Sequence, residues 1–96
     1  MTIINLICRL IDKLEQNFPN PFNRETKIAY RLHKPAQVKL VVFNLIGERI
    51  ATLLNDELLV GSHAVKFNAS QLTSGIYLYR IDTKNFQKTR RMLLIK

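Results

Sequence analysis

The chain has 96 residues, 47% of them hydrophobic, with three glycines and three prolines, a composition that predicts one small packed domain and excludes disordered and collagen-like classes. Its single cysteine, Cys8, excludes an internal disulfide, and no cluster of cysteine and histidine has the spacing of a zinc site. The formal charge is +8, but the basic residues are spread over many segments and mostly alternate with apolar ones, which favours a solvated strand surface over the alternative of a functional anionic partner.

The first residues carry a helical pattern, with apolar residues recurring at Ile4, Ile7, Ile11 and Leu14. This spacing predicts an amphipathic helix over Thr2 to Glu15. Arg9 interrupts the apolar run well short of the ~20 residues that a membrane span needs, and the segment lacks the basic start and the small-residue cleavage site of a Sec signal. We therefore expect residues 1–16 to form a helical or irregular leader, or the remnant of an upstream domain, ahead of a folded domain over residues 17–96.

The helical pattern stops at Asn17. Pro19 and Pro21 fix two backbone angles within three residues and make a rigid start to the domain. Phe18 and Phe22 flank this start. We expect at least one of the two phenylalanines to close one end of the core.

Short strands follow, each marked by alternation of apolar and polar residues. The inward rows are predicted as Ile28, Tyr30 and Leu32, then Val38, Leu40 and Val42, then Val65 and Phe67, then Tyr77, Tyr79 and Ile81, and last Met92 and Leu94. Val41 and Phe43 indicate that the other face of their strand is partly covered. Asn44 to Gly47 predicts a turn, and Glu48 to Leu54 the strand that returns from it.

Asn55 to Ser62 is the one polar segment of any length, and we expect a loop there. It contains the adjacent carboxylates Asp56 and Glu57. A calcium site needs six or more oxygens from a dedicated loop, so a plain turn is favoured over a cation site.

Leu72 to Tyr77 has the arrangement of a tyrosine corner, in which an apolar anchor and a tight turn precede a tyrosine whose hydroxyl bonds backbone upstream. That device belongs to Greek-key sandwiches. The chain then turns at Lys84 and Asn85, and Gln87 to Lys96 alternates up to the last residue. Because final residues fray unless something holds them, this last strand is expected to pair in a sheet or to meet a partner.

About six to seven short strands without interleaved helices predict an all-β fold, a small antiparallel immunoglobulin-like β-sandwich of Greek-key type. A small barrel is the alternative. The residues offer little chemistry: His33 and His63 have no catalytic partners nearby in sequence, the seven acids are scattered, and the glycines stand alone. We expect no enzyme, no catalytic residue, no cofactor, no metal and no small-molecule substrate.

Four blocks, in unbroken order from residue 14 to residue 96, carry a resemblance to a known family. They are residues 14–23, 44–53, 67–80 and 88–96. Together they resemble the type A C-terminal sorting domain of the bacterial type IX secretion system, the Por secretion tail family. The resemblance implies a targeting module that directs a cargo protein to the cell surface or exterior in Bacteroidetes-type bacteria.

The resemblance also implies partners and site residues. The partners are an outer-membrane translocon that reads the domain and a sortase-like peptidase that removes it, with the cargo expected upstream. The family's motif positions fall on Asn20, Pro21, Phe22, Gly47, Gly75 and Tyr77, which we expect to be structural. The sorting signal falls on Lys88, Thr89, Arg90, Arg91, Met92, Leu93, Leu94, Ile95 and Lys96, whose edge backbone and basic side chains are suited to strand addition.

The family's cargo proteins reach the periplasm behind a Sec signal, so a chain without one is expected to depend on a larger cargo protein. The competing hypothesis is a non-catalytic structural or assembly module similar to the C-terminal immunoglobulin-like domain of flagellar hook-capping proteins. A third hypothesis, charge-driven binding of nucleic acid, predicts steep weakening with salt. The scattered charge does not favour it, and we expect no nucleic-acid partner.

Overall fold

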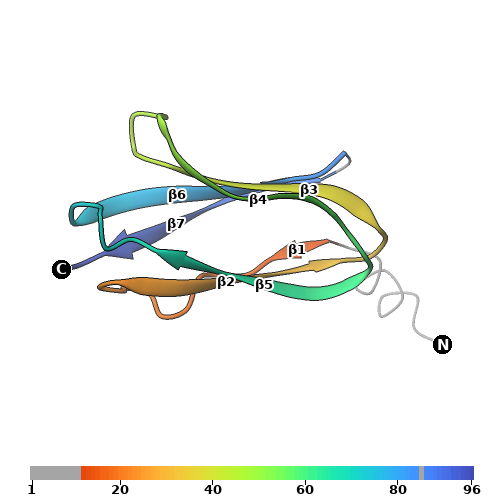
Figure 1. Cartoon of the computed structure of the whole chain (residues 1–96), viewed down its shortest axis with the longest axis horizontal. Coiled ribbons are helices and arrows are strands. Elements are labelled where there is room, and N and C mark those ends of the chain that lie inside the picture. The colour runs from red at the N-terminus through yellow and green to blue at the C-terminus, as the bar shows by residue number, and fades with distance from the viewer. Residues whose placement is uncertain (1–11, 85) are drawn as a thin grey trace.

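The structure is a computed structural model that describes residues 12–84 and 86–96, and in this part the chain forms seven strands in two antiparallel sheets. Figure 1 shows the sheets as two stacked layers. The strands are β1 (Lys13–Leu14), β2 (Glu25–Leu32), β3 (Ala36–Phe43), β4 (Arg49–Leu58), β5 (Gly61–Asn68), β6 (Gly75–Asp82) and β7 (Gln87–Leu94). The prediction of a small antiparallel β-sandwich is confirmed.

One sheet has the order β1-β2-β5 and the other β4-β3-β6-β7. β3 lies between β4 and β6, and the chain passes through β5 in the other layer before β6 returns beside β3. This crossing between layers is typical of immunoglobulin-like sandwiches. β1 and β7 are edge strands on the same side of the sandwich, because Arg90 Nε of β7 donates to the Leu14 carbonyl of β1 at 2.7 Å.

The core lies between the layers and is filled by the alternate residues that the sequence predicts. In β3, Val38, Leu40 and Val42 are fully buried. Val41, which faces the other way, is also buried, and Arg80 directly opposite it places its guanidinium 4.9 Å from the centre of the Phe43 ring. The expected partial cover on that face is therefore present. Each fully buried aliphatic side chain contributes about 1.5–3 kcal/mol of hydrophobic free energy.

The predicted loop over residues 55–62 is wrong. β4 continues to Leu58, and Asp56 and Glu57 pair with Val38 and Gln37 of β3. The segment is polar because β4 is an edge strand with exposed side chains, and charged residues on an edge hinder pairing with other chains. The actual turn is the short apolar pair of residues between Leu58 and Gly61.

The predicted helix is wrong for its last residues, since Lys13 and Leu14 form β1 by pairing with Arg31 and Tyr30. Tertiary pairing overrides a helical pattern here, and Leu14 is 1% exposed in the core. The remainder of the helix prediction, up to residue 11, lies outside the described residues. The division of the chain at residue 17 stays a prediction, and the sandwich includes residues on both sides of it.

The last strand is shorter than predicted. β7 ends at Leu94 because its partner there, Gly75, is the first residue of β6. Ile95 and Lys96 continue beyond the ladder and are exposed. The inward direction of Met92 and Leu94, at 1% and 0% exposure, is confirmed.

Candidate recognition surface at the terminal strand

β7 divides its side chains between the core and the surface. Met92 and Leu94 point inward, while Thr89 and Arg91 are exposed and Leu93 is half-buried on the outer face. Among the strands of the described residues, β7 pairs with β6 alone and is therefore an edge strand. In an antiparallel ladder, alternate residues direct both backbone groups away from the paired strand. On β7 these are the odd-numbered residues, as the contacts of Leu93 demonstrate.

The open edge beside Leu93 is covered by residues 16–23, which we call the proline segment. The Leu93 amide donates to Asn20 Oδ1 at 3.0 Å, and the Leu93 carbonyl accepts from the Phe22 amide at 3.0 Å. The Ile95 amide then donates to the Phe22 carbonyl at 2.8 Å. Phe22 thereby forms a parallel bridge with Leu94 and acts as a short additional strand outside β7.

The proline segment also contacts β7 closer to the start of the strand. Gln16 Nε2 donates to the Arg91 carbonyl at 2.7 Å. The Arg91 amide and both backbone groups of Thr89 have no such partner among the described residues. The open part of the edge is therefore limited to Thr89 and Arg91, with Gln87 at the start of the strand.

Tyr79 anchors the start of the proline segment from inside the core. Its hydroxyl donates to the Glu15 carbonyl and accepts from the Asn17 amide, both at 2.8 Å. Burial raises the pKa of Tyr79 to about 12, with a smaller opposing effect from the Asn17 amide. The hydroxyl therefore stays protonated and serves as both donor and acceptor. Asn17 itself donates from Nδ2 to Thr26 Oγ1 and to the Pro19 carbonyl, both at 3.0 Å, which folds the segment back on itself.

The last residue is also held in place. The Lys96 amide donates to Ser74 Oγ at 2.9 Å, and Lys96 Nζ donates to the Ser70 carbonyl at 2.6 Å. Both partners belong to the corner between β5 and β6. A shallow hollow of about 160 Å³ lies nearby on the outer face, and its lining includes Asn20, Ile76 and Leu93.

The residues at the motif positions have local structural contacts. Phe22 is 3% exposed and packs edge-to-face on Phe67, with ring centres 6.4 Å apart, so one of the two flanking phenylalanines does close the core. Gly47 has φ of 89°, a conformation that glycine adopts without steric cost, and it lies in the turn before β4. The Tyr77 hydroxyl donates to the Thr73 carbonyl at 2.7 Å. This bond confirms the predicted tyrosine corner, which opens at Gly75.

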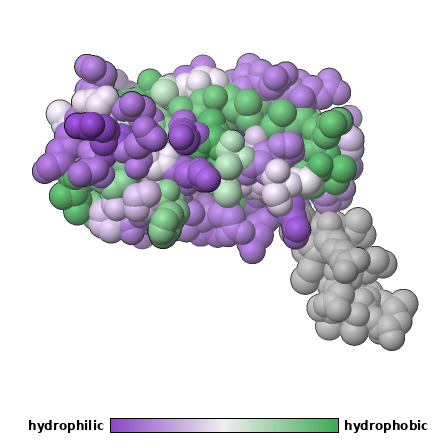
Figure 2. All heavy atoms as spheres, turned by 60° about the horizontal axis from the view of Figure 1, so that its bottom comes forward, coloured by the Kyte–Doolittle hydropathy of each residue, from purple (hydrophilic) through white to green (hydrophobic). Residues whose placement is uncertain are grey.

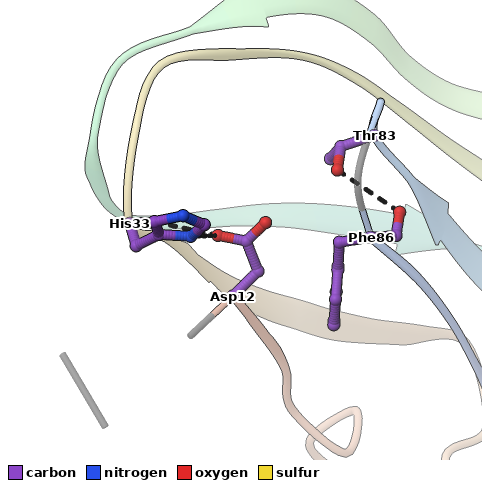
Figure 3. A network of polar contacts seen from close by, with 4 residues as sticks. All are labelled: Asp12, His33, Thr83 and Phe86. Carbon is purple, nitrogen blue, oxygen red and sulfur yellow. Dashed lines mark hydrogen bonds and ion pairs between the residues drawn. The ribbon is translucent and has the colours of Figure 1, made fainter. Parts of the chain in front are cut away.

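The histidines have structural contacts as well. The backbone amide of His33 donates to Asp12 Oδ1 at 2.9 Å, and its Nδ1 contacts the same oxygen (Figure 3). The ring of His63 stacks on Tyr30 with centres 5.5 Å apart.

Within residues 12–84 and 86–96, no group of three or more acidic, histidine or cysteine side chains is placed to hold a metal ion. In the same part of the chain, no helix is long and apolar enough to cross a membrane.

Sequence reasoning identified β7 but missed what covers it. Gln16 and Tyr79 carried no signal of their roles, because each acts through hydrogen bonds to backbone groups far away in the sequence. Asn20 was placed in a motif by resemblance, and the structure brings it together with Leu93. Gly47 lies elsewhere, in the turn between β3 and β4.

A comparison with known protein families finds a match that covers most of the chain. The model of a family described as the secretion system C-terminal sorting domain matches residues 16–96. A search of curated proteins found no match. The matched range starts at the first residue of the proline segment and ends at the last residue of the chain.

Proposed function

Since the chain belongs to the family of secretion system C-terminal sorting domains and is a sorting signal of type IX secretion cargo, we propose that residues 88–96 form the part of the signal that a receptor contacts. The single observation that carries this proposal is the open edge of β7, where both outward backbone groups of Thr89 and the outward amide of Arg91 have no partner within the described residues. A receptor strand can pair with such groups, and side chains beside the edge add specificity.

Contacts on both sides of β7 limit how the receptor reads it. Met92 and Leu94 are buried, so they act by holding the strand in the sandwich. Leu93 has both backbone groups occupied by the proline segment. Recognition by strand addition is therefore confined to the stretch from Gln87 to Arg91, and further towards the C-terminus the exposed groups are the side chains of Ile95 and Lys96.

The remaining partners are the cargo protein and the components of the secretion machinery. The domain acts with the type IX secretion machinery and directs a cargo protein to the cell surface or exterior. We propose the outer-membrane translocon as the receptor for β7 and a sortase-like peptidase as the enzyme that removes the domain. In the same proposal, residues 1–16 are the leader that joins the domain to the cargo upstream, with Lys13 and Leu14 at its end paired into the sandwich as β1. Cargo and domain together pass through the periplasm behind a Sec signal.

The test uses the full chain fused behind a reporter that carries a Sec signal, expressed in a bacterium with a type IX system. Thr89→Pro removes the outward amide of Thr89 without removing a bond of the β6–β7 ladder, and proline is tolerated on edge strands. Thr89→Ala keeps that amide and is the matched control. We expect the proline variant to accumulate in the periplasm and the alanine variant to be exported, with thermal unfolding of the two purified chains compared as a check on folding.

A second pair of variants tests the side chains. Arg91→Glu reverses an exposed charge next to the open edge, and Arg49→Glu makes the same change on β4 at the opposite edge of the sheet. We expect only the first to impair export. Normal export of both Thr89→Pro and Arg91→Glu would show that β7 is not the recognised surface.

A further inference from the structure

The outer face of the three-stranded sheet carries a concentration of positive charge. The even-numbered residues of β2 are buried in the core, so its odd-numbered residues lie on the outer face. The register places the odd-numbered residue of β1 and the even-numbered residues of β5 on the same outer face. The cations there are Lys13, Lys27, Arg31 and Lys66, which we call the basic face. Two acids, Glu15 and Glu25, lie on the same face, so the cations outnumber the anions by two. Figure 2 shows the molecule from this side, with hydrophilic residues interspersed among hydrophobic ones.

Like charges on this face stand directly opposite one another. Lys27 of β2 pairs with Lys66 of β5, and Lys13 of β1 pairs with Arg31 of β2. Side chains at directly opposite positions have Cβ atoms about 4.5–5.5 Å apart, and like charges placed there destabilise a sheet. Glu15 relieves Lys13 through an ion pair of 3.2 Å. No acidic side chain in the described chain comes within ion-pair distance of the other cations of the basic face.

The four-stranded sheet is arranged differently. There Lys39 of β3 stands opposite Asp82 of β6, so a cation meets an anion. The four-stranded sheet thus has one cross-strand pair of opposite charge, whereas the three-stranded sheet has two pairs of like charge. An anionic partner would remove the repulsion between Lys27 and Lys66, which no ion pair within the described residues relieves.

The shape of the basic face and one aromatic side chain indicate the kind of partner. Ala29 and Ala64 stand opposite each other between the charged rows. Hollows lie on either side of this pair, one lined by residues that include Lys13 and Arg31 and the other by residues that include Phe18, Lys27 and Lys66. Phe18 pairs with Lys27 through two backbone hydrogen bonds of 2.9 Å and extends the row of the two lysines across the sheet. Its side chain is 80% exposed.

We propose that the basic face docks on an anionic phospholipid surface, with its lysines and arginine on the headgroup phosphates and Phe18 at the level of the headgroups. Basic side chains beside an exposed aromatic ring are the combination that binds the interface of a negatively charged bilayer. The Phe18 side chain, exposed beside Lys27, can enter the apolar edge of the headgroup layer, which favours a membrane over an acidic protein as the partner.

The experiment is co-sedimentation of the full chain with vesicles, one set of pure phosphatidylcholine and one of equal parts phosphatidylcholine and phosphatidylglycerol. At about 0.1 M salt the screening length is about 10 Å, so distant charges contribute little. The test variant is Lys27→Gln with Lys66→Gln. The matched control is Arg49→Gln with Lys84→Gln, which removes two exposed cations outside the basic face and gives the same net charge.

Each lysine near an anionic surface is worth about fivefold in binding, so the test variant should bind the charged vesicles about 25-fold more weakly than the unmodified chain. The control should bind within about threefold of the unmodified chain, because its charges lie away from the bilayer. Phe18→Ser should weaken binding severalfold without changing net charge.

Three results would overturn the proposal. They are no binding of the unmodified chain to charged vesicles, equal binding to both vesicle types, and equal losses in the test and control variants. The first would leave an acidic protein surface as the partner, and the last would mean that total charge, rather than this face, drives binding. None of these results depends on export, so the assignment of β7 as the recognised strand is tested separately.

Discussion

The side chain of Asn20 accepts a hydrogen bond from the backbone amide of Leu93, 73 positions further along the chain. This contact fastens the beginning of the matched domain to its final strand. Together with Phe22 it occupies the edge of β7 that would otherwise be open to another strand. The residues at the start of the domain therefore control the edge of the strand that carries the proposed signal.

Asn20→Ala removes the acceptor for the Leu93 amide. Because water can replace the lost partner at this exposed site, we expect a loss of only about 0.5–1.5 kcal/mol of unfolding free energy. Amide hydrogen exchange at Leu93 should become faster. Asn20→Asp, which keeps an acceptor oxygen at the same position, should retain slow exchange, and equal exchange in all three chains would contradict the assigned bond.

Tyr79→Phe removes the hydroxyl that bonds both Glu15 and Asn17. The Glu15 carbonyl and the amide of the buried Asn17 then lose their partner at once, and we expect the unfolding free energy to fall by about 1–3 kcal/mol. Denaturant unfolding at neutral pH measures this loss. Tyr77→Phe is a useful comparison because it removes one bond, to Thr73, and should cost less.

The raised pKa of Tyr79 predicts a specific loss of stability in alkali. The raised pKa lets the folded chain hold the Tyr79 proton up to about pH 12, whereas the unfolded chain releases it near the ordinary tyrosine value of 10.0. Between these values the folded state binds more protons, so stability is complete below pH 10 and declines as pH rises towards 12, by about 1–2 kcal/mol. The same pH series of unfolding free energies for Tyr79→Phe, subtracted from that of the unmodified chain, isolates the contribution of Tyr79, because the other titrating groups are common to both chains. A difference that stays constant over this pH range would refute the prediction.

Lys66→Glu should stabilise the domain. The substitution places a carboxylate opposite Lys27 and converts a repulsive cross-strand pair into an attractive one, for a gain of about 0.2–1 kcal/mol. Lys66→Gln removes the repulsion alone and should give part of the gain. Denaturant midpoints of the three chains at low and high salt provide the measurement, and the differences should shrink as salt increases.

Local patterns predicted the sandwich because alternation reports directly which side chains face the core. Val38, Leu40 and Val42 were found in this way, and so was the tyrosine corner at Tyr77, whose bond spans only four residues. The loop predicted over residues 55–62 failed because a solvent-exposed edge strand has the same polar composition as a loop. At Lys13 and Leu14 the helical spacing predicted a helix, but these residues pair with β2 as a strand.

The candidate site was only partly predictable for a related reason. The position of β7 could be found from its sequence, since its alternation is local. The cover over its edge could not, because Asn20 and Gln16 act on backbone groups more than seventy residues away. A side-chain amide that bonds distant backbone leaves no periodicity, and the surrounding residues do not indicate its target. The like-charge pairs likewise depend on the register between β2 and β5.

The parallel bridge between Phe22 and Leu94 has a mechanical consequence. When the two ends of the domain are pulled apart along the strand direction, the bonds from Phe22 to Leu93 and from Ile95 to Phe22 lie across the line of force and are sheared together. Bonds loaded in this way must break together, whereas bonds at a peeled edge break one after another. Tension from an attached cargo, with the last strand held by a receptor, would therefore load these bonds in shear where the proline segment adjoins β7.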